Sequence, residues 1–427
     1  MTIRDPSHFR LLYRRAARAR AVVVITLALV AASALLVAPN SIGKSRSSRG
    51  DSLSAATQPT GAWSGQASAV GRAARWRRPA QTTTTAGTLA DPVSPPAVLQ
   101  PSPSAGGPAV GVQLHGMWND YSDAQRLAVL DKIAAGHMRW VRIDMGWSSF
   151  QDRCRSCYNS WYMDRADFVV NAARQRGLQV LVTAWRTPGW ANGGAGDLAP
   201  PANPADFGSF MAWLAGRFRG RVSAYEIWNE PDSRDFFTGS VGQYAALVRA
   251  AYPAVKSGDP DARVVLGGPI NNNTDWLRSV YQAGAGGSFD VMATHPYMGP
   301  SDLPPETPDL RGDNIYLLTH VAAVHELMKV NGDGDKPIWF TELGWSSHPN
   351  TGDEPNWDRG VTPQQQADYA IRAIQLVRSR YPYVTNMILY NERNRATGDV
   401  QLDNYGILHR DLSEKPVYTA LRSYLSG

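Results

Sequence analysis

The sequence predicts an α/β protein whose residues 109–427 form a (β/α)8 TIM barrel, preceded by a transmembrane helix and a disordered linker. From residue 109, short runs rich in valine, isoleucine and aromatic residues alternate with helical stretches, eight times in all. The length of 319 residues suits a closed barrel better than an open doubly wound sheet. No GxGxxG motif follows any of these runs, so a dinucleotide cradle is not indicated.

The N-terminal segment predicts a membrane anchor. Residues 1–20 carry six arginines and one acid, and residues 21–38 contain no charged or amide side chain. Eighteen helical residues span about 27 Å, close to the thickness of a bilayer core. The positive flank places residues 1–20 in the cytoplasm. We therefore expect a single-pass protein of the cell membrane with its catalytic domain outside the cytoplasm.

Two other interpretations of residues 21–38 exist. A cleaved signal peptide would make the protein secreted, although Pro39 is a poor context for cleavage. A buried core helix is excluded because nothing around the segment could cover it. Residues 39–108 are rich in Ser, Thr, Ala, Gly and Pro, and we expect this linker to be disordered because it cannot bury enough apolar surface.

Charge is unevenly distributed along the chain. Residues 1–108 hold 13 Lys and Arg against 3 Asp and Glu, a net of +10, whereas residues 109–427 hold 30 against 34, a net of −4. The overall +6 therefore belongs to the N-terminal region. Because the predicted barrel has no basic surplus to pair with phosphates, we expect no nucleic-acid partner. We also expect a monomer.

The two cysteines, Cys154 and Cys157, lie in the stretch CRSC. A disulfide is the default in an exported domain, and here it would close a small loop. A thioredoxin-like site would need a βαβ context, and a zinc site would need a second pair of ligands. Neither is present. The stretch GDGD at 332–335 lacks the other ligands of a calcium loop, so we predict no metal and no cofactor.

The predicted strands bring eight short β-forming segments into one sheet. In order they are VGVQLH (110–115), MRWVRIDM (138–145), LQVLVTAW (178–185), VSAYEIWN (222–229), ARVVLG (262–267), FDVMATHP (289–296), PIWFTEL (337–343) and TNMILYN (385–391). The carboxyl ends of parallel barrel strands meet at one mouth, where active sites of such barrels lie.

The predicted helices follow the strands and cover the barrel. They are expected near 122–136, 162–176, 205–219, 241–257, 275–284, 315–331, 363–380 and 415–425. In 363–380, Ala367, Ile371 and Ile374 recur at spacings of four and three, which places them on one helix face. Thr362 is a predicted N-cap, followed by a proline at the first helical position.

Carboxylates and aromatic side chains gather where the predicted strands end. The strand ends carry His115, Arg142, Trp147, Trp185, Asn229, Glu230, His295, Tyr297, Glu342, Trp345 and Tyr390. Aromatic faces stack on sugar rings, and two carboxyl groups flank a glycosidic bond that is to be cut. Glu226 lies about 13 Å before Glu230 along its strand, so we predict a structural role for it in the barrel interior.

The motifs WNEP at 228–231, HPY at 295–297 and TELGW at 341–345 resemble those of retaining glycoside hydrolases of clan A, most closely family 39-like and family 5-like bacterial enzymes. The resemblance covers residues 110–427. It implies an O-glycoside hydrolase that cleaves an extracellular poly- or oligosaccharide through a covalent glycosyl-enzyme intermediate. The alternatives are an inactive barrel that binds wall glycans and a transglycosylase that remodels an envelope polysaccharide.

The resemblance also implies roles for the matching residues. Glu230 matches the general acid/base and Glu342 the nucleophile, and Asn229 matches the residue that binds the sugar 2-hydroxyl. Tyr297 matches a tyrosine that hydrogen-bonds the nucleophile, and His295 a histidine on the substrate side.

Further matches complete the implied site. Arg142 matches an arginine that supports the nucleophile, and with Tyr297 it is expected to stabilise Glu342 as the anion, so that the cost of a second charge falls on Glu230. Tyr390 stands where the family usually has a tryptophan and is a candidate sugar platform.

Four candidate residues keep two interpretations. Trp147, Trp185 and Trp345 could each be a sugar platform or part of the core, and the role of His115 stays open.

Overall fold

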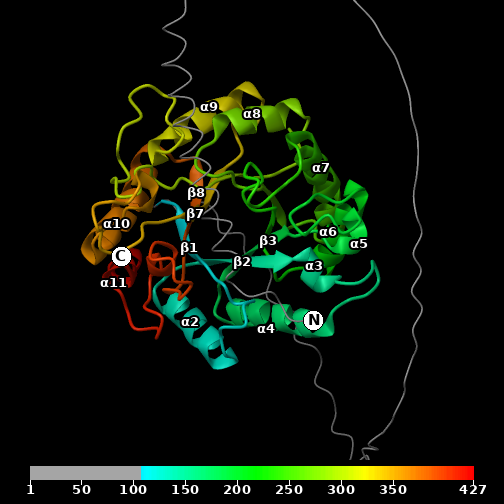
Figure 1. Ribbon diagram of the computed structural model, residues 1–427, viewed down its shortest axis with the longest axis horizontal. Helices are drawn as coiled ribbons and strands as arrows, with labels where there is room; N and C mark the ends of the chain where they lie inside the picture. Colours follow the sequence, from blue (N-terminus) through cyan, green and yellow to red (C-terminus); the bar gives the residue numbers. More distant parts are fainter. Residues whose placement is uncertain (1–106) are drawn as a thin grey trace, which may run out of the picture. The chain divides into compact units, whose positions relative to one another are not determined.

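The computed structural model describes residues 107–427 (Figure 1). The predicted cytoplasmic segment and membrane anchor, and all but the last two residues of the predicted linker, lie outside the described residues. Within 107–427, no helix has the length and apolar character needed to cross a bilayer.

Eight parallel strands form the centre of the fold, which confirms the predicted barrel. They are β1 (Ala109–Gln113), β2 (Trp140–Gly146), β3 (Gln179–Trp185), β4 (Ala224–Ile227), β5 (Arg263–Leu266), β6 (Met292–Thr294), β7 (Ile338–Leu343) and β8 (Val384–Leu389). Their order in the sheet is β5-β4-β3-β2-β1-β8-β7-β6. A parallel bridge between Val265 and Val291 joins the β5 and β6 edges and so closes the barrel.

Helices surround the strands (Figure 1). They are α2 (Asp123–Ala135), α3 (Trp147–Phe150), α4 (Ser160–Gln175), α5 (Gly189–Asn192), α6 (Pro204–Arg217), α7 (Val241–Gly258), α8 (Thr274–Gln282), α9 (Val321–Val330), α10 (Pro363–Arg380) and α11 (Pro416–Leu425). This part of the chain also has short 3-10 helices: η1 (Leu318–His320), which leads directly into α9, and η2 (Asn356–Asp358) and η3 (Leu402–Asn404), which lie in loops. Thr362 caps α10 through a capping box with Gln365, as its sequence predicted.

The barrel interior is layered, and the layers explain where the polar residues lie. One inward layer is apolar and includes Trp140, Leu181, Ala224 and Trp339. Side chains two residues further along a strand point to the same face. The next layer inward from β2, β3, β4 and β7 therefore holds Arg142, Thr183, Glu226 and Thr341, all fully buried. An apolar floor thus supports a polar layer below the mouth.

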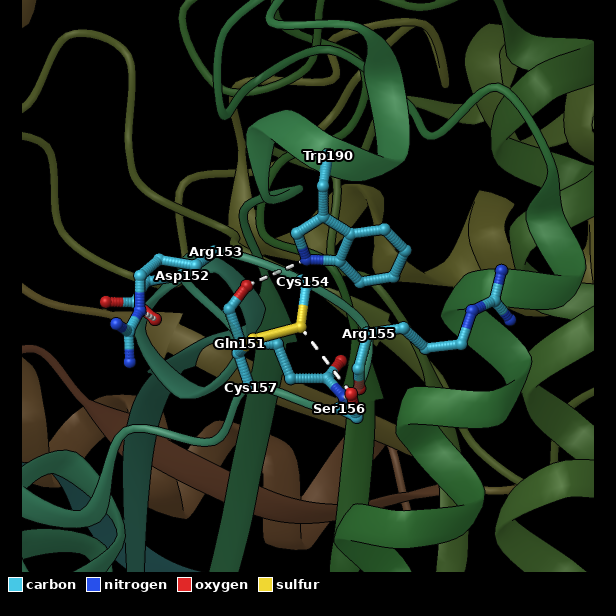
Figure 2. Close-up of a disulfide and its surroundings, with 8 residues drawn as sticks. All are labelled: Gln151, Asp152, Arg153, Cys154, Arg155, Ser156, Cys157 and Trp190. Carbon is cyan, nitrogen blue, oxygen red and sulfur yellow. Dashed lines mark hydrogen bonds and ion pairs between the residues drawn. A yellow bond between two sulfur atoms is a disulfide. The ribbon is translucent and has the colours of Figure 1, made fainter.

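The loop after β2 contains the predicted disulfide between Cys154 and Cys157, which the structure confirms (Figure 2). The loop is tied to the loop after β3, because Nε1 of Trp190 donates to the backbone oxygen of Gln151 over 2.9 Å. The Arg155 guanidinium also lies over the Trp190 ring, 5.5 Å from its centroid.

Candidate active site

Glu230 and Glu342 come from opposite sides of the barrel and meet at its mouth. Glu230 follows β4 and Glu342 lies in β7, with 8% and 9% of their surfaces exposed. One carboxylate oxygen of each and one ring nitrogen of His295 all lie within 4.8 Å of one another. The backbone at both positions departs from regular strand. Glu230 has φ of 44°, and the pairing of β7 with β8 shifts register between Phe340 and Leu343.

Arg142 connects the polar layer of the barrel interior to the residues at the mouth. Its Nη1 donates to Oε1 of Glu342 over 2.6 Å, and its Nη2 donates to Oδ1 of Asn229 over 2.7 Å. Its Nε donates to Oε2 of Glu226 over 2.7 Å. Burial alone would lower the pKa of Arg142, but Glu226 and Glu342 raise it above its ordinary value. The guanidinium is therefore a permanent cation beside the predicted nucleophile, where the sequence placed it.

Glu342 receives a donor on each oxygen. Arg142 donates to Oε1, and Oη of Tyr297 donates to Oε2 over 3.0 Å. Two donors suit an ionised carboxylate. Burial nevertheless raises the pKa of Glu342, with Glu230 adding to this effect and His295 and Arg142 opposing it. Burial and Glu230 thus oppose ionisation of Glu342, whereas Arg142 and the Tyr297 hydroxyl favour it.

Glu226 is a buried structural anion, as its place in the strand predicted. It is fully buried and accepts from Arg142, from Oγ1 of Thr183 over 2.6 Å and from Oγ1 of Thr341 over 2.7 Å. Burial acts to raise the pKa of Glu226, but Arg142, His295 and the two threonines outweigh burial and lower it. Glu226 is therefore ionised in the folded protein.

A chain of hydrogen bonds runs from Glu230 to Glu226 through His295. Nδ1 of His295 lies 3.0 Å from Oε1 of Glu230, and Nε2 lies 3.1 Å from Oγ1 of Thr341. Burial lowers the pKa of His295, with Arg142 acting in the same direction, against the carboxylates Glu342 and Glu226. The imidazole is therefore neutral near pH 7 and has one N–H.

The position of that proton follows from the rest of the chain. The hydroxyl of Thr341 donates to Glu226, which is ionised and can only accept. The Thr341 oxygen is then free to accept from Nε2–H of His295, which leaves Nδ1 without a proton. Nδ1 faces Oε1 of Glu230, so this hydrogen bond forms only when Glu230 carries the proton. The hydrogen bonds thus suit opposite states of the two mouth carboxyls, with Glu230 protonated and Glu342 ionised.

Gly268 makes the approach of His295 possible. A Cβ at position 268 would lie 2.6 Å from Cδ2 and Nε2 of the His295 ring, so no larger residue fits beside it. The Gly268 backbone oxygen also accepts from the Glu230 backbone N–H over 3.1 Å. Gly268 therefore holds the backbone of Glu230 and leaves room for the ring of His295.

An aromatic wall lines the β8 side of the mouth. The half-buried ring of Tyr390 stands edge-on to Tyr297 at 6.5 Å, to Tyr405 at 5.7 Å and to His115 at 5.6 Å between centroids. His115 is buried, with Nδ1 3.0 Å from Oε2 of Glu392. The structure thus brings Tyr390 and His115 beside Tyr297, and His115 contacts Glu392 within the wall.

For two of the three tryptophans with two interpretations, the structure favours the core over a sugar platform. Trp147 begins α3 and is fully buried, stacked on Phe210 with 5.6 Å between ring centroids. The short helix turns its ring away from the mouth into the layer between strands and helices. Trp345 has 3% of its surface exposed, and its Nε1 donates to the Leu303 backbone oxygen over 2.9 Å. Both indoles are core residues without a free face for a sugar.

Trp185 keeps both of its interpretations, as a sugar platform and as part of the core. It ends β3 with 7% of its surface exposed, close to the fractions at Glu230 and Glu342. One face of its ring is covered by the Arg186 guanidinium, 4.2 Å from the ring centroid.

Sequence reasoning missed Glu392, Thr341 and the pair formed by Trp118 and Arg395. Glu392 is 1% exposed and accepts from His115 and from Oη of Tyr121. Its signal was present in the stretch YNERNR at 390–395, where an acid follows a predicted strand. Thr341 stands next to Glu342 in the TEL motif.

The sequence and fold can now be compared with those of known proteins. The model of the cellulase family, glycosyl hydrolase family 5, matches residues 104–361, more than half of the chain. The chain belongs to glycosyl hydrolase family 5. This confirms the clan A resemblance drawn from WNEP, HPY and TELGW.

Individual relatives of this family 5 chain are distant. A β-xylosidase from Caldicellulosiruptor saccharolyticus is 25% identical over 238 residues, which are 53% of this chain and 47% of the xylosidase. The chain thus spans about half the length of that relative. A family 39 glycoside hydrolase from Bacteroides cellulosilyticus WH2 has a TM-score of 0.59 at 20% identity, covering 75% of this chain and 64% of its own.

A further solved structure has the same fold. A variant of GH5_18 from Streptomyces cattleya in complex with Manb1-4GlcNAc has a TM-score of 0.59 at 17% identity, covering 75% of this chain and 80% of its own. At these identities the structural likenesses show the barrel fold.

Glu230, His295 and Glu342 of this family 5 domain also have the atom types of a metal site. Their hydrogen bonds favour the chain from Glu230 through His295 to Glu226 over a metal site. Arg142 places a cation 2.6 Å from Glu342, and a metal there would repel it. Nδ1 of His295 and Oε1 of Glu230 are already paired with each other. The three side chains thus fit acid and base chemistry better than metal binding.

Proposed function

We propose that this family 5 chain is a retaining O-glycoside hydrolase acting on a poly- or oligosaccharide outside the cytoplasm. One observation carries the proposal: the two mouth carboxyls, with one oxygen of each within 4.8 Å of the other, have hydrogen bonds that suit opposite protonation states. Retaining enzymes hold their carboxyls about 5–5.5 Å apart, whereas inverting enzymes need about 6.5–9.5 Å to admit water.

In the first step, Oε2 or Oε1 of Glu342 attacks the anomeric carbon while Glu230 gives its proton to the leaving oxygen. The C–O bond to the leaving group breaks as the bond to Glu342 forms, which yields the glycosyl-enzyme and a free alcohol. Asn229 is held by Arg142 at the same level as Glu342, where it can bind the sugar 2-hydroxyl. Tyr390 offers a half-buried ring as a platform.

In the second step, Glu230 acts as a base. Esterification removes the negative charge from Glu342, and Glu230 is now the anion. It takes a proton from water, whose oxygen attacks the anomeric carbon and releases the sugar with its original configuration. Glu342 is again ionised beside Arg142 and Tyr297, and Glu230 again carries a proton toward His295.

The stereochemistry of azide products tests these roles separately. Glu342→Ala should lose at least about 10³-fold in kcat/KM, and azide should then give a glycosyl azide of inverted configuration by single displacement. Glu230→Ala should still form the intermediate from a dinitrophenyl glycoside, and azide should give the retained product. The substrates are a panel of aryl β-glycosides that includes the β-xyloside and β-glucoside, because the family and the xylosidase relative suggest β-linked sugars.

The outcomes separate the alternatives. Near-normal turnover by Glu342→Ala, or an inverted sugar from the unsubstituted enzyme by NMR, would contradict the retaining mechanism. Binding without turnover across the panel would favour an inactive glycan-binding barrel. Oligosaccharide products that grow at high acceptor concentration would favour a transglycosylase.

We also propose that residues 21–38 anchor the enzyme in the cell membrane and that the barrel acts as a monomer. The support for the anchor is the charge and hydropathy of the N-terminal sequence. Full-length protein should sediment with membranes and be digested by protease added outside intact cells. A chain of residues 39–427 should instead stay in the supernatant when the membranes are sedimented. Light scattering of residues 107–427 should give one chain per particle.

A further inference from the structure

Arg395 lies in the aromatic wall of the mouth and forms no ion pair with a carboxylate of residues 107–427. Its Nη1 donates to Oη of Tyr390 over 3.1 Å, and its guanidinium carbon lies 4.1 Å from the centroid of the Trp118 ring. Tyr390 stands edge-on to Tyr297, which donates to Glu342. Two rings therefore separate this guanidinium from the predicted nucleophile.

The acids around Arg395 are bound to other groups. Among residues 107–427, no salt bridge joins Arg395 to an acid. Glu392 accepts from His115 and Tyr121, and Asp403 accepts from the backbone and hydroxyl of Thr397. The remaining acids nearby are also bound, Asp399 to the backbone of Gln401 and Leu402, and Asp120 to Arg393.

The backbone at Arg395 is held in place. Its own N–H donates to the Asp403 backbone oxygen over 3.0 Å, and the preceding Asn394 donates from Nδ2 to Oδ1 of Asn404 over 3.0 Å. With Trp118 on one side and the Tyr390 hydroxyl on the other, the guanidinium is oriented before any ligand arrives. Pre-orientation lowers the entropy cost of binding a ligand there.

We infer that Arg395, supported by Trp118 and Tyr390, binds an acidic group on the substrate, so that the enzyme prefers glycans containing a uronic acid. A guanidinium has five N–H donors, and in Arg395 only one has an acceptor within the described residues. The remaining donors form the planar fork that matches a carboxylate in a bidentate pair. This inference rests on the proposed hydrolase function and specifies its substrate class.

An acidic substrate would need such a residue. The mouth already holds the anion of Glu342, which would repel a second carboxylate in a poorly solvated cleft. Arg142 cannot offset the new charge, because it is fully buried and its donors go to Glu226, Glu342 and Asn229. Arg395 is half-buried at the wall and keeps its charge available there.

The test uses β-linked oligosaccharides that contain glucuronic acid, each paired with its carboxyl-reduced counterpart, in which that unit is glucose. We expect a higher kcat/KM for the acidic member of at least one pair. Arg395→Gln should lower that preference about tenfold or more, as the loss of a charge-assisted pair predicts, and change hydrolysis of the neutral member little. Arg395→Lys should keep part of the preference, because it keeps the charge and loses the fork.

The matched control is Arg372→Gln, which removes an arginine from the outer helix α10. It should leave the acidic-to-neutral ratio unchanged. The inference is overturned if the unsubstituted enzyme has no acidic preference, or if Arg395→Gln lowers both members equally, as a role in hydroxyl binding or folding would.

The two proposals can fail separately. Hydrolysis of neutral members without acidic preference keeps the hydrolase and rejects the acidic subsite. If no member is cleaved, titration calorimetry of the same pairs with Glu342→Gln still measures the affinity ratio, and an equal affinity within each pair rejects the subsite.

Discussion

Nδ1 of His295 lies 3.0 Å from Oε1 of Glu230, and in the neutral ring it accepts a hydrogen bond from the protonated Glu230 carboxyl. This contact links the predicted general acid to the barrel interior. His295 touches the carboxyl rather than the bond that is cut, so we assign it a positioning role.

Replacing His295 by Phe should impair acid assistance in particular. The variant keeps a ring but removes the acceptor that orients the Glu230 proton. We expect kcat/KM to fall roughly 10²-fold for phenyl glycosides, whose leaving group needs a proton, and much less for dinitrophenyl glycosides. The slope of rate against leaving-group pKa measures the effect. His325→Phe, on α9, serves as control, and an equal loss on all leaving groups would indicate general misfolding instead.

Removing the charge of Arg142 should destabilise the fold strongly. Arg142→Met leaves Glu226 and Glu342 buried without their shared cation, and we expect a loss of about 3–5 kcal/mol in the free energy of unfolding. Urea denaturation followed by fluorescence measures it. The comparison is Arg372→Met, whose ion pairs are partly exposed and should cost about 0–1 kcal/mol. Similar losses in both variants would contradict the central place of Arg142.

Glu226 should make the barrel sensitive to acid. Its pKa is lowered in the folded state, so its contribution to stability is present above the ordinary glutamate pKa of 4.5 and is lost as pH falls through the lower folded value. Glu226→Gln should be less stable at pH 7 but lose less stability between pH 5 and pH 3. Denaturation midpoints across this range test the prediction, and parallel curves for the two proteins would refute it.

Lys415 should give a dependence of the same sign in a higher pH window. It is buried, with Nζ donating to Oδ1 of Asn394 and to the Asn404 backbone oxygen, and burial lowers its pKa to about 7. The unfolded chain then binds more protons than the folded one between about pH 7 and 10.5, so stability rises with pH in that window. The unfolding free energy of the unsubstituted protein minus that of Lys415→Met should therefore rise from pH 7 to pH 10. A constant difference would count against it.

Most of the fold could be predicted from local patterns. The eight strands and the covering helices have strong periodicity, and the α10 boundary carries its own signals in Thr362 and Pro363. The carboxyl pair was predictable for a similar reason, because parallel strands deliver their ends to one mouth. Strand position therefore located Glu230, Glu342, Arg142 and Asn229 without any knowledge of loops.

The aromatic residues were harder because strand position does not set ring direction. Trp147 stands one residue beyond β2, but a four-residue helix turns it into the core. The wall containing Arg395 and Trp118 depends on two loops whose mutual contact has no signature in either sequence. Loop geometry, rather than composition, decided which aromatic residues reach the mouth.

The hydrogen-bond chain from Glu230 to Glu226 has a fixed polarity with a chemical consequence. Once Glu230 has given its proton away, its anion faces the lone pair of Nδ1 of His295. The ring can switch tautomer only if Thr341 turns its hydroxyl away from Glu226. With Glu230 ionised and His295 neutral, every arrangement of the chain thus has one hydrogen bond fewer than the arrangement with Glu230 protonated. In the proposed mechanism, the barrel interior thereby favours the return of a proton to Glu230 from the attacking water.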